Sequence, residues 1–246
     1  MSRQKSIRFR ESKSMHNIVE WEKPGYLEMA GNWNEKQFDN QNKLVLELAC
    51  GKGEYTHGLA RQFPEKNFIG MDIKGSRIYV GASACIREGI SNAAFLRGKI
   101  ENIRSFFGWR EISEIWITFP DPRPKDRDEK RRLTFRRFLE LYQHILKEDG
   151  IVHLKTDNAA LMEYSRQSVQ DFGASIIADT DNLYESPWKD EHYGIKTYFE
   201  NKFTAIGHSI HYLQFRLPVI ERPLSEVPPI YLRGIPVDAA SDAEAG

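Results

Sequence analysis

The feature that most constrains the fold is a regular alternation of short apolar segments with longer amphipathic ones. The short segments, rich in β-branched and aromatic residues, predict strands at residues 43–48, 67–73, 93–97, 112–118, 150–156, 174–178 and 209–217. Helical periodicity between them predicts helices at about 54–63, 75–88, 132–147, 158–172 and 198–206. This alternation is typical of an α/β fold, with a mostly parallel seven-stranded sheet covered by helices on both faces.

Such sheets bind ligands where their strands end. The first predicted strand runs into ELACGKGE, in which Gly51 and Gly53 allow a sharp turn and close approach of a ligand. An ordinary tight turn has the same glycines, so this pattern alone is weak. Asp72 ends the second strand, where an acid can accept hydrogen bonds from both hydroxyls of a ribose. Glu47 lies inside the first strand, and its burial requires a partner, either a ligand amino group or a structural Arg or Lys.

The ligand class is narrowed by what the loop lacks. Asp72 alone does not distinguish NAD from S-adenosylmethionine, but the G-x-G-x-x-G pattern is incomplete because Thr56 occupies its last position. No G-x-x-x-x-G-K-[ST] phosphate loop occurs in the sequence either. These observations favour a methyl donor over NAD and ATP. After the third strand, Gly98 and Lys99 are expected to lie against an adenine or on a plain surface loop.

The loop after the fourth predicted strand combines a held carboxylate with positive charge. Asp121 lies between Pro120 and Pro122, which stiffen the backbone, so it is well placed for a ligand unless the segment is only a rigid surface turn. Residues 123–137 then hold eight basic and three acidic side chains, in a chain with 35 of each sign. Because this excess begins beside the expected site, phosphate binding is favoured over a solvated helix face.

These motifs resemble the bacterial tRNA (guanine-N7)-methyltransferases over about residues 43–217. The resemblance is carried by three motifs in the right order: Phe119-Pro120-Asp121-Pro122 with Lys125 and Lys130-Arg131-Arg132, Lys155-Thr156-Asp157, and Thr197-Tyr198-Phe199-Glu200. Some positions depart from the family. Ala49 replaces the first loop glycine, which should be tolerable if its φ is negative, Arg123 and Pro124 are unusual, and the acid expected near Gly98-Lys99 is absent.

The resemblance implies a Rossmann-like class I fold and methyl transfer from S-adenosylmethionine to N7 of a tRNA guanosine, that of the variable loop. It implies one catalytic residue, Asp121, which would accept hydrogen bonds from the N1–H and exocyclic amine of guanine. The implied donor-binding residues are Glu47, Ala49, Gly51, Gly53, Asp72, Gly98, Lys99 and Asp121. The implied tRNA contacts are Lys125, Asp157, Thr197, Tyr198, Phe199 and Glu200. Asp157 has a second interpretation as a helix cap, and one of Tyr198 and Phe199 is expected in the core.

The chain is expected to have three parts. Residues 1–30 form a basic, partly flexible arm that either meets phosphates or is a solvated terminus, 31–220 form the methyltransferase domain, and 221–246 form an extension with a disordered acidic tail. There is no signal peptide, no apolar run long enough to span a membrane and no metal-binding spacing around Cys50 or Cys85. We therefore expect a cytoplasmic monomer or homodimer with no membrane or metal partner.

Three other functions remain open at this point. They are a noncatalytic tRNA-binding module of the same fold, an NAD-dependent oxidoreductase, and a methyltransferase for another amino or nucleobase substrate. The first is disfavoured because a pure binder has no need of Glu47, Asp72 and Asp121, and the second by the incomplete glycine pattern. The remaining conspicuous side chains are expected to be structural: His57, Trp109, Cys50, Trp116 and His153.

Overall fold

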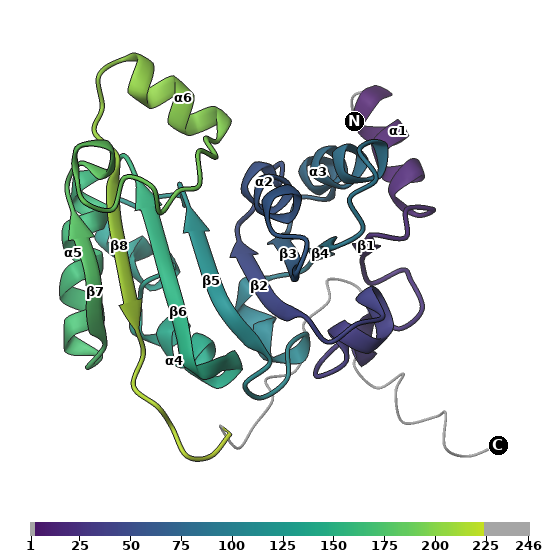
Figure 1. Ribbon diagram of the computed structural model, residues 1–246, viewed down its shortest axis with the longest axis horizontal. Helices are drawn as coiled ribbons and strands as arrows, with labels where there is room; N and C mark the ends of the chain where they lie inside the picture. The colour runs from purple at the N-terminus through teal and green to yellow at the C-terminus, as the bar shows by residue number, and fades with distance from the viewer. Residues whose placement is uncertain (1–2, 224–246) are drawn as a thin grey trace.

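The computed structural model describes residues 3–223, and within them it has one eight-stranded sheet between two layers of helices (Figure 1). The strands in sequence order are β1 (Ile18–Val19), β2 (Lys43–Leu48), β3 (Lys66–Asp72), β4 (Ala93–Arg97), β5 (Ile112–Thr118), β6 (Leu146–Thr156), β7 (Ser175–Thr180) and β8 (His211–Arg216). Their spatial order is β1-β4-β3-β2-β5-β6-β8-β7. Strands β1 to β6 are parallel, and β8 runs antiparallel to β6 and β7.

All seven predicted strands are present, and the predicted count of seven is one short because of β1. That strand has two residues, too few to show a periodicity, and it pairs with β4 at the edge of the sheet. The chain order reverses between the neighbouring strands β2 and β5. Such a switch point opens a crevice at the carboxyl ends of the strands, and the predicted site residues follow β2, β3, β5 and β6 there.

The α-helices of the described residues are α1 (Arg3–Ser12), α2 (Glu54–Gln62), α3 (Gly75–Arg87), α4 (Arg136–Ile145), α5 (Ala159–Asp171) and α6 (Tyr198–Ala205). Helix α1 lies within the expected basic arm and packs beside α3 (Figure 1). The helix predicted at 132–147 is wrong at both ends. At its start, a 3-10 helix at Asp126–Arg131 comes first and α4 begins only at Arg136. At its end, Leu146 already belongs to β6, because it pairs with Ile112 of β5 and is buried.

Two hydrophobic clusters fill the faces of the sheet. One packs the sheet against α2 and α3, and the other packs it against α4 and α5. Side chains along β2 alternate between them, with Leu44, Leu46 and Leu48 in one cluster and Val45 in the other. By the same alternation, Glu47 faces α2.

No helix among residues 3–223 is long and apolar enough to cross a membrane. The same residues contain no group of three or more His, Cys, Asp or Glu side chains that could hold a metal ion. The expected extension at 221–246, with its acidic tail, lies outside the described residues apart from 221–223.

Candidate active site

Two adjoining cavities lie where the strands end, and both are lined by Ala49. The first has a volume of about 350 Å³ and is lined by Ala49, Asp72, Ile73, Lys99, Ile100, Glu101, Pro120, Asp121, Arg123, Arg131, Leu133 and Phe138. The second has a volume of about 170 Å³ and is lined by Ala49, Cys50, Gly51, Lys52, Glu54, Arg77, Thr118, Phe119, Thr197, Tyr198 and Phe199. Most of the predicted site residues therefore meet in one crevice, formed by the loops after β2, β3, β4 and β5 together with α6.

The loop after β2 is shaped by three left-handed residues. The φ angles of Ala49, Gly51 and Gly53 are 55°, 58° and 68°. A Cβ at Gly53 would lie 2.3 Å from the Phe95 ring, so glycine is needed there. Ala49 therefore does not have the negative φ under which an alanine was expected to be tolerable at this position. Its methyl group is held in a conformation that costs about 1–2 kcal/mol for a residue with a Cβ.

Asp72 is held in place by main-chain groups. One carboxylate oxygen accepts a hydrogen bond from Gly51 N at 2.9 Å, and the other accepts one from Lys74 N at 2.8 Å. The side chain is 8% exposed and lines the first cavity. Because each oxygen has two acceptor sites, the carboxylate keeps capacity for a ligand's hydroxyl groups. Its position at the end of β3 fits the predicted ribose contact.

Glu47 lies behind the same loop and does not line either cavity. Its carboxylate accepts hydrogen bonds from Thr56 N at 2.8 Å, Thr56 Oγ1 at 2.5 Å and Thr118 Oγ1 at 2.8 Å. Burial raises the pKa of Glu47 to about 7, against the opposing effect of these bonds. The partners are an amide and two hydroxyls, rather than the Arg, Lys or ligand amine considered from the sequence. Glu47 thus ties the start of α2 to the end of β5.

The loop after β5 places Asp121 in the lining of the first cavity, together with Ala49 and Asp72. Phe119 and Arg123 both have φ of 49°, so the chain turns sharply on either side of Asp121. The Asp121 side chain is 61% exposed, and Oδ2 lies 3.2 Å from Arg123 Nε. Lys125 is exposed at the start of the 3-10 helix that follows, outside both cavity linings.

Of the two residues after β4 that were predicted to lie against an adenine, one lines the first cavity. Lys99 lines the first cavity together with Ile100, whereas Gly98 lies one residue behind it and donates its N–H to the Asp72 carbonyl at 3.2 Å. Ile73, which follows Asp72, is 53% exposed and adds an apolar surface to the same cavity. The first cavity therefore places the Asp72 carboxylate, fixed by main-chain hydrogen bonds, beside an apolar surface.

Helix α6 has a buried side and an exposed side. Thr197 caps it by accepting from Glu200 N at 3.1 Å, and Glu200 accepts from Thr197 N at 3.3 Å in return. Glu200 is fully buried, 2.8 Å from the equally buried Lys155 Nζ, and it also accepts a hydrogen bond from Tyr184. Burial lowers the pKa of Lys155, while the Glu200 charge opposes that shift. The structure thus turns Glu200 inward, away from a substrate.

Tyr198 and Phe199 lie on the outer side of α6, 57% and 45% exposed. The expectation that one of them belongs to the core is wrong, because the interior position of the motif is taken by Glu200. Their rings meet edge to face with centroids 5.6 Å apart, and Lys52 Nζ lies 5.1 Å from the centre of the Tyr198 ring. Two aromatic faces and a cation therefore border the second cavity.

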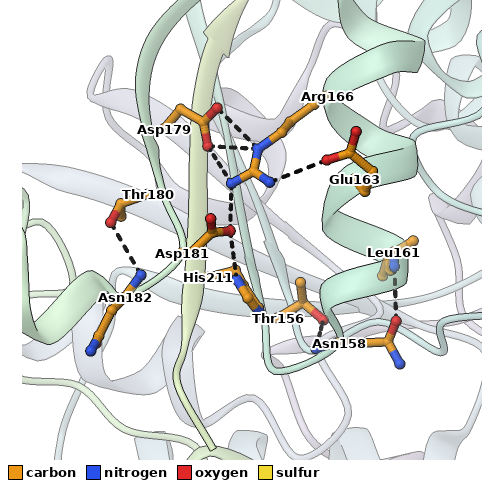
Figure 2. Close-up of polar contacts among 10 residues, drawn as sticks. All are labelled: Thr156, Asn158, Leu161, Glu163, Arg166, Asp179, Thr180, Asp181, Asn182 and His211. Atoms are coloured by element: carbon orange, nitrogen blue, oxygen red, sulfur yellow. Dashed lines mark hydrogen bonds and ion pairs between the residues drawn. The ribbon is translucent and has the colours of Figure 1, made fainter.

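Asp157 follows β6 and faces His208, with Oδ2 3.6 Å from Nδ1. It is not the cap of α5, because Asn158 accepts from Leu161 N at 2.8 Å (Figure 2). Figure 2 also shows Arg166 of α5 bonded to Asp179 and Asp181, and Asp181 bonded to His211. This network braces the edge strand β7 and its neighbour β8 against α5.

The pairing of Lys155 with Glu200 was missed from the sequence, although a signal was present. Lys155 stands in an apolar strand that is expected to be buried, and a buried ammonium requires a charged partner. The structural interpretations of three other side chains are confirmed. Cys50 and Trp116 are buried, and His153 is buried with its Nδ1 2.7 Å from Tyr212 Oη and its ring stacked on Trp116.

Comparison with known proteins gives concordant results. A family model described as "Putative methyltransferase" matches residues 41–213. The tRNA (guanine-N(7)-)-methyltransferase of Cytophaga hutchinsonii is 42% identical over 217 residues, which cover 87% of this chain and 98% of that protein. The protein of the same name from Bacteroides thetaiotaomicron is 44% identical over 204 residues, covering 82% and 80%.

Among solved structures, the 16S rRNA methyltransferase KamB matches with a TM-score of 0.58 at 13% identity, covering 75% of this chain and 92% of that one. TrmN from Thermus thermophilus matches with a TM-score of 0.51 at 17% identity, covering 72% and 44%. At such identities the likeness concerns the fold alone. Together with the sheet order, it confirms the expected Rossmann-like class I methyltransferase fold.

Proposed function

The chain belongs to the tRNA (guanine-N7)-methyltransferase family, and from this premise we propose that it methylates N7 of a guanosine in tRNA with S-adenosylmethionine as the donor. The observation that carries the proposal is the meeting of Asp72 and Asp121 in one cavity, within residues 41–213, which match the methyltransferase family model. The specific target is the guanosine of the variable loop. The enzyme acts in the cytoplasm, where its two free, buried cysteines stay reduced, as a monomer or a homodimer.

The first cavity fits the adenosyl part of the donor. Asp72 offers a preoriented carboxylate to the ribose hydroxyls, and Ile73 with Leu133 and Phe138 offers an apolar surface to the adenine. Backbone groups at Ala49, Gly51 and Lys99 complete the contacts. Three residues outside the cavity linings act indirectly, by holding these loops in place: Gly53, Gly98 and Glu47. When bound, the donor supplies a methyl group that is activated by a positively charged sulfur.

Orientation is the main task of the protein's own residues in this reaction. Guanine N7 has an in-plane lone pair and no proton, so no side chain has to act as a general base. Asp121 accepts hydrogen bonds from the guanine N1–H and exocyclic amine, which adenine cannot provide together. The prolines around it keep the carboxylate in one position, and Arg123 holds it until a base arrives.

The second cavity and its surroundings receive the tRNA. A guanosine in the folded core of a tRNA has to swing out to react, and Tyr198 and Phe199 offer exposed faces on which a base can stack. Thr197 lines the cavity beside them, and Asp157 lies at the end of the neighbouring strand β6. Lys125 and the basic segment 123–137 contact phosphates. Glu200 acts from the interior by holding Thr197 and α6.

The test is incubation of the protein with unmodified tRNA and a methyl-labelled donor, followed by borohydride and aniline treatment. We expect stoichiometric label and one chain scission, in the variable loop, because aniline cleaves at reduced N7-methylguanosine. A tRNA with adenosine at that position should remain unlabelled. Label without scission would favour methylation of another atom. Donor that does not bind in calorimetry would favour the noncatalytic module instead.

A further inference from the structure

Three exposed cationic side chains stand on the edge of the crevice that is formed by the loop after β2 and the first turn of α3. They are Lys52, Lys74 and Arg77, and we call them the basic rim. Lys52 and Arg77 line the second cavity, whereas Ile73, the neighbour of Lys74, lines the first. The basic rim therefore borders the second cavity through Lys52 and Arg77, and Lys74 stands beside a residue of the first.

The acids beside the basic rim accept hydrogen bonds from main-chain amides. Glu54 accepts a hydrogen bond from Tyr198 N at 3.3 Å, and both oxygens of Asp72 accept from main-chain amides. Within residues 3–223, no carboxylate lies within ion-pair distance of a basic-rim side chain, and Lys52 contacts the Tyr198 ring instead. The basic rim thus presents three positive charges without an ion-pair partner among these residues, on a chain whose formal net charge is zero.

The basic segment 123–137 differs from the basic rim in its position and in the number of its cations that form ion pairs. It borders the first cavity through Arg123 and Arg131, after β5, whereas the basic rim follows β2 and β3 across the switch point. Several of its cations are paired with neighbouring carboxylates, at 3.2 Å for Arg123 with Asp121 and 3.1 Å for Arg131 with Asp128. The basic rim is therefore a separate basic surface and not an extension of that segment.

We propose that the basic rim binds backbone phosphates of the RNA strand whose nucleotide enters the second cavity. This inference rests on the proposed function and adds a site to it. A nucleotide that stacks its base on Tyr198 or Phe199 brings its phosphates to the rim of the same cavity, where Arg77 and Lys52 stand. The Arg77 guanidinium suits a phosphate because its planar fork donates two parallel hydrogen bonds. Lys52 and Lys74 add point charges beside it.

The other anion that could reach this cavity is the carboxylate of the donor's amino-acid part. The two anions predict different losses when Arg77 is removed. A phosphate contact lowers the affinity for tRNA and its dependence on salt, and leaves donor affinity unchanged. A carboxylate contact lowers donor affinity and leaves the salt dependence of tRNA binding unchanged.

The experiment measures the tRNA Kd of Arg77→Ala across a salt series, with donor Kd by calorimetry on the same preparation. We expect the tRNA Kd to rise about tenfold near 0.1 M salt, and the slope of log K against log salt to fall by about one. Lys52→Ala and Lys74→Ala should each reduce the slope in the same way. The matched control is Arg87→Ala, an exposed arginine at the far end of α3, which should bind tRNA as the wild type does.

An unchanged tRNA Kd and salt slope in Arg77→Ala would overturn the proposal, and so would a loss confined to donor affinity. Either result leaves the proposed function intact as long as the wild type methylates tRNA. If the wild type itself transfers no methyl group to tRNA, the proposed function fails, and that outcome is seen in a separate assay. The two failures are thereby distinguished.

Discussion

The two sides of the crevice are built in different ways. On the donor side, main-chain amides and left-handed loop residues hold Asp72 at the end of a central strand. On the tRNA side, the eight-residue helix α6 carries the exposed aromatic residues and is held from inside by Lys155 and Glu200. A helix of this length is not stable alone, so its position depends on those few side chains. The donor side is thus fixed by the sheet, and the tRNA side by one buried ion pair.

This difference implies that substitutions separate the two binding events. Changes on the donor side should alter donor affinity with little effect on tRNA affinity, and changes under α6 should do the reverse. Asp121 is the exception, because it shares a cavity with Asp72 yet is assigned to the guanine. It provides the largest expected effect.

We expect Asp121→Asn to lower kcat by about 10²- to 10³-fold, because the amide removes a preoriented charge from the reacting base. Donor affinity should stay near the wild-type value. The measurement is single-turnover methyl transfer to tRNA, with donor binding followed by calorimetry. The matched variant is Asp72→Asn, which should weaken donor binding and leave tRNA binding unchanged. Wild-type turnover in Asp121→Asn would remove Asp121 from the reaction.

Lys155→Met tests the anchor of α6. It leaves the Glu200 carboxylate buried without its cation, which should cost about 3–5 kcal/mol in the free energy of unfolding. The double variant Lys155→Met/Glu200→Gln lacks both charges of the pair and should recover most of that loss. If α6 needs the ion pair to be positioned, the KM for tRNA stays raised in the double variant while donor affinity is normal. Urea unfolding and steady-state kinetics give both quantities.

The control for Lys155 is another ion-pair network, that of Arg166 with Asp179 and Asp181 (Figure 2). Its carboxylates are more exposed, so Arg166→Met should cost about 1 kcal/mol or less. It should also leave the KM for tRNA unchanged. Equal losses of stability in Lys155→Met and Arg166→Met would show that burial of the first pair has no special importance.

Glu47 is a buried carboxyl group on the donor side, and it gives stability a dependence on pH. Its pKa is raised from 4.5 to about 7 by burial, so the folded protein binds a proton more tightly than the unfolded chain does. Stability should therefore fall as the pH rises from about 4.5 to 7 and stay lower above that. The expected loss is about 3 kcal/mol.

Glu47→Gln should remove this part of the pH dependence, because the amide does not titrate. Urea unfolding of the wild type and the variant at pH 5 and pH 8 measures the difference. The expected result is a smaller fall in stability between the two values in Glu47→Gln. Parallel changes in both proteins would place the pKa of Glu47 near its ordinary value and contradict the assignment.

The sequence predicted the donor side better than the tRNA side, for a physical reason. The end of a buried strand followed by Gly51 and Gly53, and an acid at the end of the next strand, are local patterns, and parallel strands bring them together. The direction of Glu200 depends instead on Lys155, which is 45 residues away in sequence. No periodicity of a short helix reveals such a partner. The same holds for Leu146, whose place in β6 is set by pairing with β5.

Tyr198 and Phe199 show a second limit of sequence interpretation. Two adjacent aromatic residues at the start of a helix suggest at least one core contact, because exposed apolar faces are costly. The capping box fixes α6 so that Glu200 takes the interior position and both rings face outward. Large exposed aromatic residues indicate a surface on which a base can stack. Their exposure could not be predicted from periodicity.

The smallest expected effect concerns Ala49, where the donor side departs from the family's glycine. Its φ of 55° is strained for a residue with a Cβ, so Ala49→Gly should raise the free energy of unfolding by about 1 kcal/mol. For a chain of this size that is a rise in Tm of about 2–4 °C. The control Ala84→Gly, inside α3, should lower stability by a similar amount because glycine is unfavourable in a helix. A lower Tm in both variants would mean that Ala49 is not strained. The backbone of the loop after β2 would then be less constrained than the hydrogen bond from Gly51 to Asp72 implies.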